Sequence, residues 1–361
     1  MNYYIHVPFC ASKCGYCAFY SEAGVSSGRI GEFLTHLEKQ LAAVPDDAAA
    51  ETIYIGGGTP TLLSAAQLER LLEQLFACLN PVPDCEVSIE ANPETLDREK
   101  IALLRKYVSR LSLGVQSFDE VSRCRIGRRC SQEKLMQAME LVSAAGFPHW
   151  NCDLIYSLPG QTAGMWENDL ITAGCSGADH ISCYALTPEE NSRLGGEFEA
   201  DDERESRFYM MAEEILASFG IKRYEISNYA SPGGRCRHNL NVWRGGRLCG
   251  FGPAAAGFDG TDRMIEPESL DKWLTGAPPE WDKIPHDVRL NEIFAVNLRT
   301  VDGWTPELWA AVPGADGWSA RRKIAAKLEK IFPEYLHNQQ GCIKLTGNGL
   351  LFWNMIAQEL F

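Results

Sequence analysis

The stretch YYIHVPFCASKCGYCAFY, residues 3–20, places three closely spaced cysteines directly after a short apolar run. Residues 3–7 are predicted to form the first strand. Cys10, Cys14 and Cys17 then follow within eight residues, on a segment that looks like a loop. The sequence therefore predicts three thiols on one loop that follows the first strand.

The same alternation of strand and helix continues along the first two thirds of the chain. Further apolar runs predict strands at residues 52–55, 86–89, 111–115, 151–155 and 180–184. Amphipathic segments between them predict helices at residues 33–43, 64–79, 97–107, 132–145, 165–173 and 203–219. Six strand–helix units predict parallel strands joined by crossover helices. Since a closed barrel has eight such units, we expect an α/β fold built as an open, partial (β/α)6 barrel.

The clearest predicted helix is SAAQLERLLEQLFACL, residues 64–79. Its leucines recur at helical spacing, which predicts one buried face. Ser64 and Gln67 stand three residues apart at its start, as a capping box requires.

Short, distinctive motifs follow the ends of the predicted strands. GGGTP follows the second strand, EANP the third, QSF the fourth and SLPGQ the fifth. In barrels and in open α/β sheets, ligands bind at the carboxyl ends of the parallel strands. Motifs at this place in successive units therefore predict one shared site.

The alternation of predicted strands and helices ends at about residue 267. The Pro- and Trp-bearing stretch GAPPEWDKIP, residues 276–285, leads into predicted helices at 288–297 and 320–331. CIKLTGNGLLFWNMIAQEL, residues 342–360, then predicts a short strand, a glycine turn and a final amphipathic helix. We expect a barrel domain over residues 1–260 and a small C-terminal helical module with a β-wing over residues 261–361.

The composition is that of a globular protein, with 45% hydrophobic and 23% charged residues. A formal net charge of −14 argues against nucleic acid as a partner. No apolar stretch approaches the ~20 residues that span a bilayer, and the first residues lack a signal-peptide pattern. We therefore expect a cytoplasmic protein whose thirteen cysteines are thiols, most of them buried as small hydrophobic residues.

The three clustered thiols favour an iron–sulfur centre over zinc. A tetrahedral zinc site takes a fourth protein ligand, usually from a second cysteine or histidine pair, and the sequence has no second CxxC. A [4Fe-4S] cluster on three thiolates leaves one iron free to bind a substrate or cofactor. Zinc and structural thiols are the alternatives.

The Cys-x3-Cys-x2-Cys spacing, with Tyr16 before the last cysteine, resembles the signature of radical S-adenosyl-L-methionine (SAM) enzymes. YIHVPFC, GGGTPT, ANPE, GVQSF, DLIYSLPGQT, YEISNYA and CRHN are similar to motifs of the coproporphyrinogen III dehydrogenase-like family. This resemblance runs from residue 4 to about residue 260 and resumes weakly at LRTVDG and KLTGNG. It implies an oxygen-sensitive [4Fe-4S] cluster on Cys10, Cys14 and Cys17, whose open iron is chelated by SAM. One electron from the cluster then cleaves the sulfonium to give a 5′-deoxyadenosyl radical.

The resemblance also implies which residues contact SAM. They are Tyr4, Gly57, Gly58, Thr59, Glu90, Gln116, Arg128 and Asp153, with backbone contacts from Tyr16 and Ala185. Arg128 suits a carboxylate, and Glu90 or Asp153 can accept from hydroxyl or ammonium groups. The glycines let backbone groups approach a ligand. The structural alternatives are that Asp153 caps a turn and that Arg128 pairs with a surface acid.

Two features favour the haem-chaperone (HemW-like) branch of this family over the dehydrogenases. The dehydrogenases typically read CxxxCxxCxC, and Phe19 stands at the position of the extra cysteine. They also carry a longer extension before the cluster loop, whereas this chain begins nine residues before Cys10. Both features point away from porphyrinogen decarboxylation.

The chaperone branch is associated with a haem-binding HNxxYW motif, and this chain reads HNLNVW over residues 238–243. His238 could supply an axial nitrogen to haem iron, and Trp243 could line the porphyrin face. Val242 replaces the tyrosine of the motif, and Ala256 stands where relatives tend to have a histidine. The alternative is that His238 is a hydrogen-bonded structural residue.

Two functions are therefore expected as alternatives. In the first, the protein is a haem chaperone that delivers haem to a respiratory acceptor protein, with cluster and SAM needed for dimerisation or release. In the second, it is a radical enzyme that acts on a tetrapyrrole, by oxidative decarboxylation of coproporphyrinogen III or by anaerobic haem opening. An electron donor such as flavodoxin or ferredoxin would reduce the cluster, and a homodimer and a peripheral membrane contact stay open.

Overall fold

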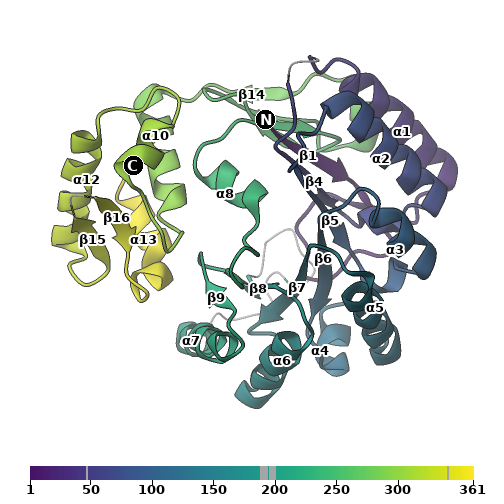
Figure 1. The fold of residues 1–361 in the computed structure, drawn as a ribbon, viewed down its shortest axis with the longest axis horizontal. Helices are drawn as coiled ribbons and strands as arrows, with labels where there is room; N and C mark the ends of the chain where they lie inside the picture. Colours follow the sequence, from purple (N-terminus) through teal and green to yellow (C-terminus); the bar gives the residue numbers. More distant parts are fainter. Residues whose placement is uncertain (46–47, 188–193, 195–200, 340) are drawn as a thin grey trace.

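The computed structural model describes residues 1–45, 48–187, 194, 201–339 and 341–361. It confirms the expected α/β class, with a curved, mostly parallel sheet that carries helices on its outer side (Figure 1). The six parallel strands of the partial barrel are β1 (Asn2–Val7), β4 (Thr52–Gly57), β5 (Glu86–Ala91), β6 (Arg110–Gln116), β7 (His149–Tyr156) and β8 (His180–Ala185). The outer helices are α1 (Ser27–Leu41), α2 (Ala65–Leu79), α3 (Arg98–Leu104), α4 (Glu120–Arg125), α5 (Gln132–Ala145), α6 (Ala163–Cys175) and α7 (Asp202–Ser218).

The described sheet is larger than the sequence predicts. Its order is β14-β13-β12-β11-β1-β4-β5-β6-β7-β8-β10-β9. The unpredicted β11 (Leu248–Phe251) pairs in parallel with β1 from Leu248 to Phe251 and adds a seventh parallel strand. Antiparallel strands extend both edges: β12 (Ala256–Phe258), β13 (Arg263–Ile265) and β14 (Glu280–Asp282) on one side, β10 (Asn228–Ala230) and β9 (Lys222–Arg223) on the other.

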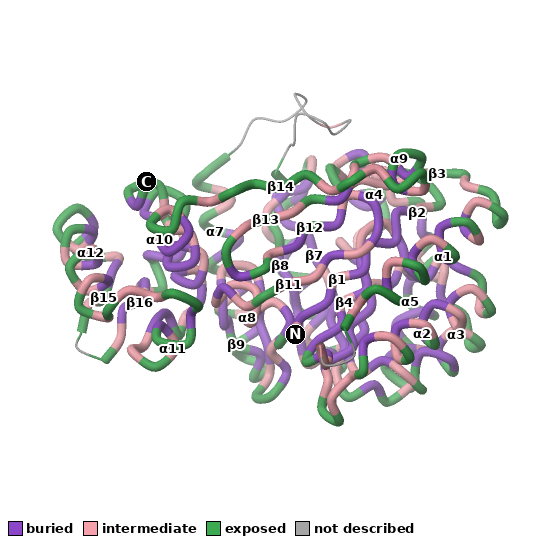
Figure 2. Tube along the Cα trace, turned by 90° about the horizontal axis from the view of Figure 1, so that it is seen from above, coloured by how far each residue is buried: buried purple, intermediate pink, exposed green. Residues whose placement is uncertain are grey.

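The local sequence signals of α2 are confirmed. Ser64 Oγ accepts from the backbone N–H of Gln67 at 3.3 Å, and the Gln67 side chain accepts from the Ser64 N–H at 3.0 Å. The capping box therefore satisfies two of the backbone N–H groups that have no partner within the helix. The leucines of the predicted face are fully buried, and Figure 2 shows buried segments concentrated along the strands that such helices cover.

The C-terminal part of the chain forms the expected small helical module beside the barrel (Figure 1). Its elements are α10 (His286–Asn297), α11 (Pro306–Ala310), α12 (Trp318–Ile331), β15 (Leu336–Gln339), β16 (Cys342–Leu345), the 3-10 turn Gly349–Phe352 and α13 (Trp353–Gln358). The predicted division at residue 260 stays a prediction. β13, β14 and the short helix α9 (Leu270–Leu274) lie beyond it, and both strands belong to the large sheet.

A further helix, α8 (Arg237–Trp243), lies between the barrel and the C-terminal module in Figure 1. Its first turn contacts Thr52 and Glu86, which are the first residues of β4 and β5. α8 therefore packs at the amino ends of the strands, opposite the predicted site. In the part of the chain that the structure describes, no helix has the length and apolar character required to cross a bilayer.

Candidate functional site

A cavity of about 540 Å³ lies at the carboxyl ends of the parallel strands. Its walls come from the cysteine loop after β1 and from the ends of β4 to β8. All of the residues predicted to bind cluster or SAM line it except Tyr4. These are Cys10, Cys14, Cys17, Tyr16, Gly57, Gly58, Thr59, Glu90, Gln116, Arg128, Asp153 and Ala185. The structure thus brings together residues that lie up to 175 positions apart, from Cys10 to Ala185.

The cysteine loop is fixed to the barrel at several points. β2 (Phe9–Cys10) pairs with β3 (Glu22–Ala23) across it, and the Gly15 N–H donates to the Ile126 carbonyl at 2.9 Å. The three thiols are all partly exposed to solvent and none is in a disulfide. Burial raises the pKa of the Cys17 thiol, so a positive centre is needed to hold it as a thiolate.

The donor set of this cavity fits a three-thiolate cluster. The lining includes three cysteines and, among the described residues, no histidine or fourth cysteine. Cys10 Sγ lies 3.7 Å from Thr59 Oγ1, and Cys14 Sγ accepts from Arg128 Nη1 at 3.9 Å. Over the described residues, no three His, Cys, Asp or Glu side chains stand as ligands of a single metal ion, and this holds for the three thiols of the loop as well. A [4Fe-4S] cluster here would have one iron that a small molecule can bind.

The glycine motif after β4 has a packing role besides the predicted ligand approach. Gly57 has φ 110°, and a Cβ there would lie 2.8 Å from the His6 ring. A Cβ on Gly58 would lie 2.6 Å from the Phe9 carbonyl oxygen. Only glycine lets β4 end this close to β1 and the cysteine loop.

Glu90, at the end of β5, is one of three carboxylic acids that line the cavity, with Asp153 and Glu94. Its side chain accepts hydrogen bonds from Tyr54 Oη at 2.9 Å and from the Gly57 N–H at 3.2 Å. Burial, and then the nearby Asp153, raise the pKa of Glu90 to about 7. Near neutral pH this group therefore changes between a neutral acid and a carboxylate, and a cationic ligand would favour the carboxylate.

Asp153 is the second acid and lies within β7, so it does not cap a turn. Ser112 Oγ and Asn151 Nδ2 donate to its two oxygens, each at 2.7 Å. Burial raises the pKa of Asp153, and the hydrogen bonds from Ser112 and Asn151 oppose that shift. The carboxylate is thus oriented by neighbours on β6 and β7, and among the described residues no cationic side chain donates a hydrogen bond to it.

The contacts of Arg128 also differ from the structural alternative, in which it would pair with a surface acid. Its Nη2 donates to the Gly114 carbonyl at 2.5 Å and its Nη1 approaches Cys14, rather than a surface acid. A Cβ on Gly114 would lie 2.5 Å from Arg128 Nη2, so glycine makes room for the guanidinium. The register of β6 shifts between Gly114 and Gln116, and Gln116 has φ 71°. Such a bulge with a strained residue is a common way to turn a side chain toward a site.

The structure adds cavity residues that the sequence prediction omits. They include Phe19, Tyr54, Asn92, Ser112, Arg129 and Tyr184. A signal for several of them is present in the strands, because polar and small residues occupy alternate positions there. Polar residues stand two positions apart on each of four strands. They are Ser88 and Glu90 on β5, Arg110 and Ser112 on β6, Asn151 and Asp153 on β7, and His180, Ser182 and Tyr184 on β8. This alternation indicates a polar barrel interior.

Tyr4 lies behind the cavity rather than on it. Its hydroxyl is 3.0 Å from His6 Nδ1, and its ring packs against Tyr54 with a centroid distance of 6.2 Å. His6 Nε2 in turn lies 2.9 Å from the Tyr20 carbonyl oxygen. Tyr4 therefore supports Tyr54, which does reach the cavity.

His238 lies at the other end of the barrel, on α8. Its ring is 5% exposed, with Nδ1 2.8 Å from Thr52 Oγ1, and its backbone N–H donates to Glu86 at 2.9 Å. Trp243 packs under the guanidinium of Arg299 at 4.7 Å. Haem ligation by His238 stays a prediction, and it would require α8 to leave this packing. The described contacts are those of a structural histidine.

Comparison with known proteins places these features in a family. The model of the radical SAM superfamily matches residues 4–171. Proteins named heme chaperone HemW are similar over almost the whole chain: that of Mycobacterium tuberculosis is 38% identical over 99% of this chain and 94% of its own. That of Bacillus subtilis is 31% identical over 98% and 97%. Among solved structures, coproporphyrinogen III oxidase (HemN) from Escherichia coli, a radical SAM enzyme, superposes with a TM-score of 0.83 at 19% identity, over 99% of this chain and 89% of that one.

Proposed function

This chain belongs to the radical SAM superfamily, in the family of the HemW relatives, and on that premise we propose that it is a haem chaperone that carries a [4Fe-4S] cluster and SAM. Cys10, Cys14 and Cys17 would hold the cluster. The cavity beside them would hold SAM. Haem would be bound and passed to a respiratory acceptor protein in the cytoplasm, with flavodoxin or ferredoxin as the electron donor.

One observation carries the cluster and SAM part of this proposal. Residues from the cysteine loop and from the ends of five strands line one cavity of about 540 Å³, as a shared ligand requires. Arg128 offers a guanidinium to a carboxylate, and Glu90 and Asp153 offer acceptors to ammonium and hydroxyl groups. When bound, the cluster supplies a single electron to the sulfonium of SAM. The chain's own residues orient the two groups and shield them from water.

The haem part rests on the relatives named heme chaperone and on the surface beside the cavity. Phe19 and Tyr184 both line the cavity and are 70% and 42% exposed. Exposed aromatic rings offer the apolar, flat contact that a tetrapyrrole face prefers. The alternative, a radical enzyme that converts a tetrapyrrole, uses the same cavity and is separated from the first by experiment.

The test pairs two assays on protein reconstituted with iron and sulfide without oxygen. Titration with haemin should give a stoichiometric shift of the Soret band. Incubation with coproporphyrinogen III, SAM and a reductant should give no vinyl product. Vinyl product without haemin binding would contradict the chaperone proposal and support the enzyme.

The same titration tests His238 as the haem ligand. If it is the ligand, His238→Ala abolishes the Soret shift, while His337→Ala, at an exposed position on β15, preserves it. An unchanged shift in both variants would remove His238 from the proposal and leave haem binding to other residues.

A further inference from the structure

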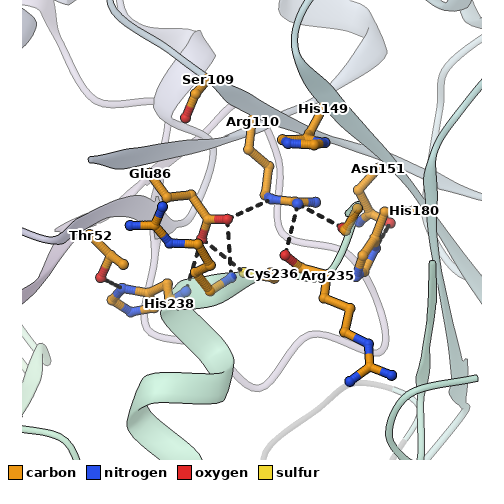
Figure 3. A network of polar contacts seen from close by, with 12 residues as sticks. Thr52, Glu86, Ser109, Arg110, His149, Asn151, His180, Arg235, Cys236 and His238 are labelled. Atoms are coloured by element: carbon orange, nitrogen blue, oxygen red, sulfur yellow. Dashed lines mark hydrogen bonds and ion pairs between the residues drawn. The ribbon is translucent and has the colours of Figure 1, made fainter. Parts of the chain in front are cut away.

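A row of buried polar side chains leads from the cavity acid Asp153 down through the barrel interior. Asn151 Nδ2 lies 2.7 Å from Asp153, and Asn151 Oδ1 lies 2.7 Å from His180 Nδ1. His180 Nε2 lies 2.8 Å from the hydroxyl of Tyr224, which accepts from the Cys236 N–H at 3.4 Å. Cys236 is the N-cap residue of α8. Figure 3 shows Asn151 and His180 beside Arg110 and Cys236 in this interior.

The donors and acceptors of this row allow one consistent direction. A carboxylate accepts hydrogen bonds only, so the amide nitrogen of Asn151 must face Asp153. The amide oxygen of Asn151 then faces His180, which must donate from Nδ1. Burial and the nearby Arg110 hold the pKa of His180 well below its ordinary value, so the ring is neutral and Nε2 is an acceptor. Tyr224 therefore donates to His180, and every donor in the row points toward Asp153.

The row is closed to larger molecules. Asn151, His180 and Tyr224 are at most 5% exposed. A second cavity beside them, of about 30 Å³, is large enough for water and too small for an organic ligand. Arg110 and Ser88 belong to its lining, and Arg110 Nη1 and Ser88 Oγ are buried with no hydrogen-bond partner in the part of the chain that the structure describes. The row therefore acts on Asp153 rather than binding a substrate itself.

We propose that Asn151, His180 and Tyr224 are positioning residues that hold the Asp153 carboxylate ionised and turned into the SAM cavity, with the α8 N-terminus as their anchor. Hydrogen bonds aligned in one direction polarise one another, so the last N–H becomes a better donor to the carboxylate. Without Tyr224, the tautomer of His180 that carries its proton on Nε2 becomes more available. In that tautomer Nδ1 no longer donates to Asn151 Oδ1, which keeps only the Ser182 hydroxyl at 3.2 Å, so the Asn151 N–H becomes a weaker donor and Asp153 is protonated more easily. This inference rests on the proposed SAM site.

Other charged and titratable groups also act on Asp153. Arg128, which follows α4, opposes the rise of its pKa, and Asp153 in turn raises the pKa of Glu90 on β5. Burial, and to a smaller extent Asp153, also raise the pKa of three tyrosines that line the same cavity, Tyr16, Tyr54 and Tyr184. These groups are unchanged in Tyr224→Phe. A change in the protonation of Asp153 in that variant can therefore be attributed to the loss of the Tyr224 hydroxyl.

The experiment compares SAM binding of the reconstituted wild type with that of Tyr224→Phe and His180→Phe by calorimetry between pH 6 and 9. We expect Tyr224→Phe to weaken binding about fivefold at neutral pH, the size of one hydrogen bond, and to shift the pH midpoint of binding upward. Tyr229→Phe is the control, because its hydroxyl is equally buried and accepts from Arg223 at 2.8 Å outside the row.

A second readout does not depend on SAM. Infrared difference spectra between each protein and its Asp153→Asn counterpart, all carrying Glu90→Gln so that Glu90 adds no carboxyl band, report the protonated carboxyl of Asp153. We expect that band at neutral pH in Tyr224→Phe and not in the wild type. If wild type fails to bind SAM, the proposed function fails, while the infrared band still tests the row. If Tyr224→Phe matches the wild type in affinity, midpoint and infrared band, the inference is overturned.

Discussion

Glu86 and Glu90 stand four residues apart on β5, yet they serve opposite ends of the barrel. Glu86, at the amino end, accepts from Arg110 Nε at 3.3 Å and from the N–H groups of Arg237 and His238 at 3.0 and 2.9 Å (Figure 3). Glu90, at the carboxyl end, has two neutral donors and lines the large cavity.

The two ends differ in whether the protein satisfies its own polar groups. At the amino end the Glu86 carboxylate accepts from the Arg110 guanidinium and from the first N–H groups of α8, which stabilises packing, and Arg110 Nη1 is left without a partner among the described residues. At the carboxyl end the thiols, acids and Arg128 surround open space and keep bonding capacity for a ligand. A polar side chain inside this barrel is thus structural or functional according to its partners and not its residue type.

The largest expected effect concerns the carboxyl end. Cys14→Ser should abolish the brown colour and broad visible absorption of reconstituted protein, because a four-iron cluster cannot be held by two thiolates and a hydroxyl here. Iron analysis measures the loss. Cys342→Ser, at a cysteine of the C-terminal hairpin, is the matched control and should keep its iron. Four irons per chain in Cys14→Ser would contradict the ligand assignment.

The next largest effect concerns the amino end of the barrel, where we expect a loss of unfolding free energy. Glu86→Gln leaves the buried Arg110 guanidinium without its carboxylate, and removing one partner of a buried pair costs about 3–5 kcal/mol of unfolding free energy. Denaturant unfolding measures this loss. The iron content of the folded fraction should stay that of the wild type. A stability within error of the wild type would show that this end is not held by the pair.

Glu90→Gln should affect ligand binding and stability in the opposite way to Glu86→Gln. We expect SAM binding to weaken about tenfold, as for loss of a charge-assisted hydrogen bond, while the folded protein becomes more stable at pH 8. The folded pKa of Glu90, about 7, lies above its ordinary value. Unfolding therefore releases a proton between about pH 4.5 and 7, so this group lowers stability as pH rises through that window.

Thermal melting at pH 5 and pH 8 checks the sign of this prediction. The gain in melting temperature of Glu90→Gln should be larger at pH 8, where wild-type Glu90 is ionised, than at pH 5. An equal gain at both values would mean that Glu90 is not the titrating group.

The smallest effect is expected for Tyr4→Phe. Tyr4 supports Tyr54 from behind, so the variant should lose about 1 kcal/mol of stability with its hydrogen bond to His6. SAM affinity should stay within about twofold of the wild type, since no cavity group is removed. Calorimetry gives the affinity and denaturant unfolding the stability. A tenfold loss of affinity would place Tyr4 in the site.

Much of the fold and of the site follows from the sequence alone, because the signals are local. Hydrophobic periodicity sets the strands and helices, and α5 begins and ends at the predicted residues, 132 and 145. Parallel strands bring their carboxyl ends to one edge, so the motifs after them had to meet. That is why residues from Cys10 to Ala185 line one cavity as the sequence predicts.

Other features are decided by contacts between distant segments, which no local pattern records. β11 pairs with β1 across about 245 residues, and α8 packs on the start of β4 and β5. Tyr4 and His238 share residue types with ligand-binding positions, but their partners are His6 and Thr52. Hydrogen bonding and burial depend on what tertiary packing places beside a side chain. The sequence therefore determined where a site could form, and only the folded chain decided which polar groups remain open to a ligand.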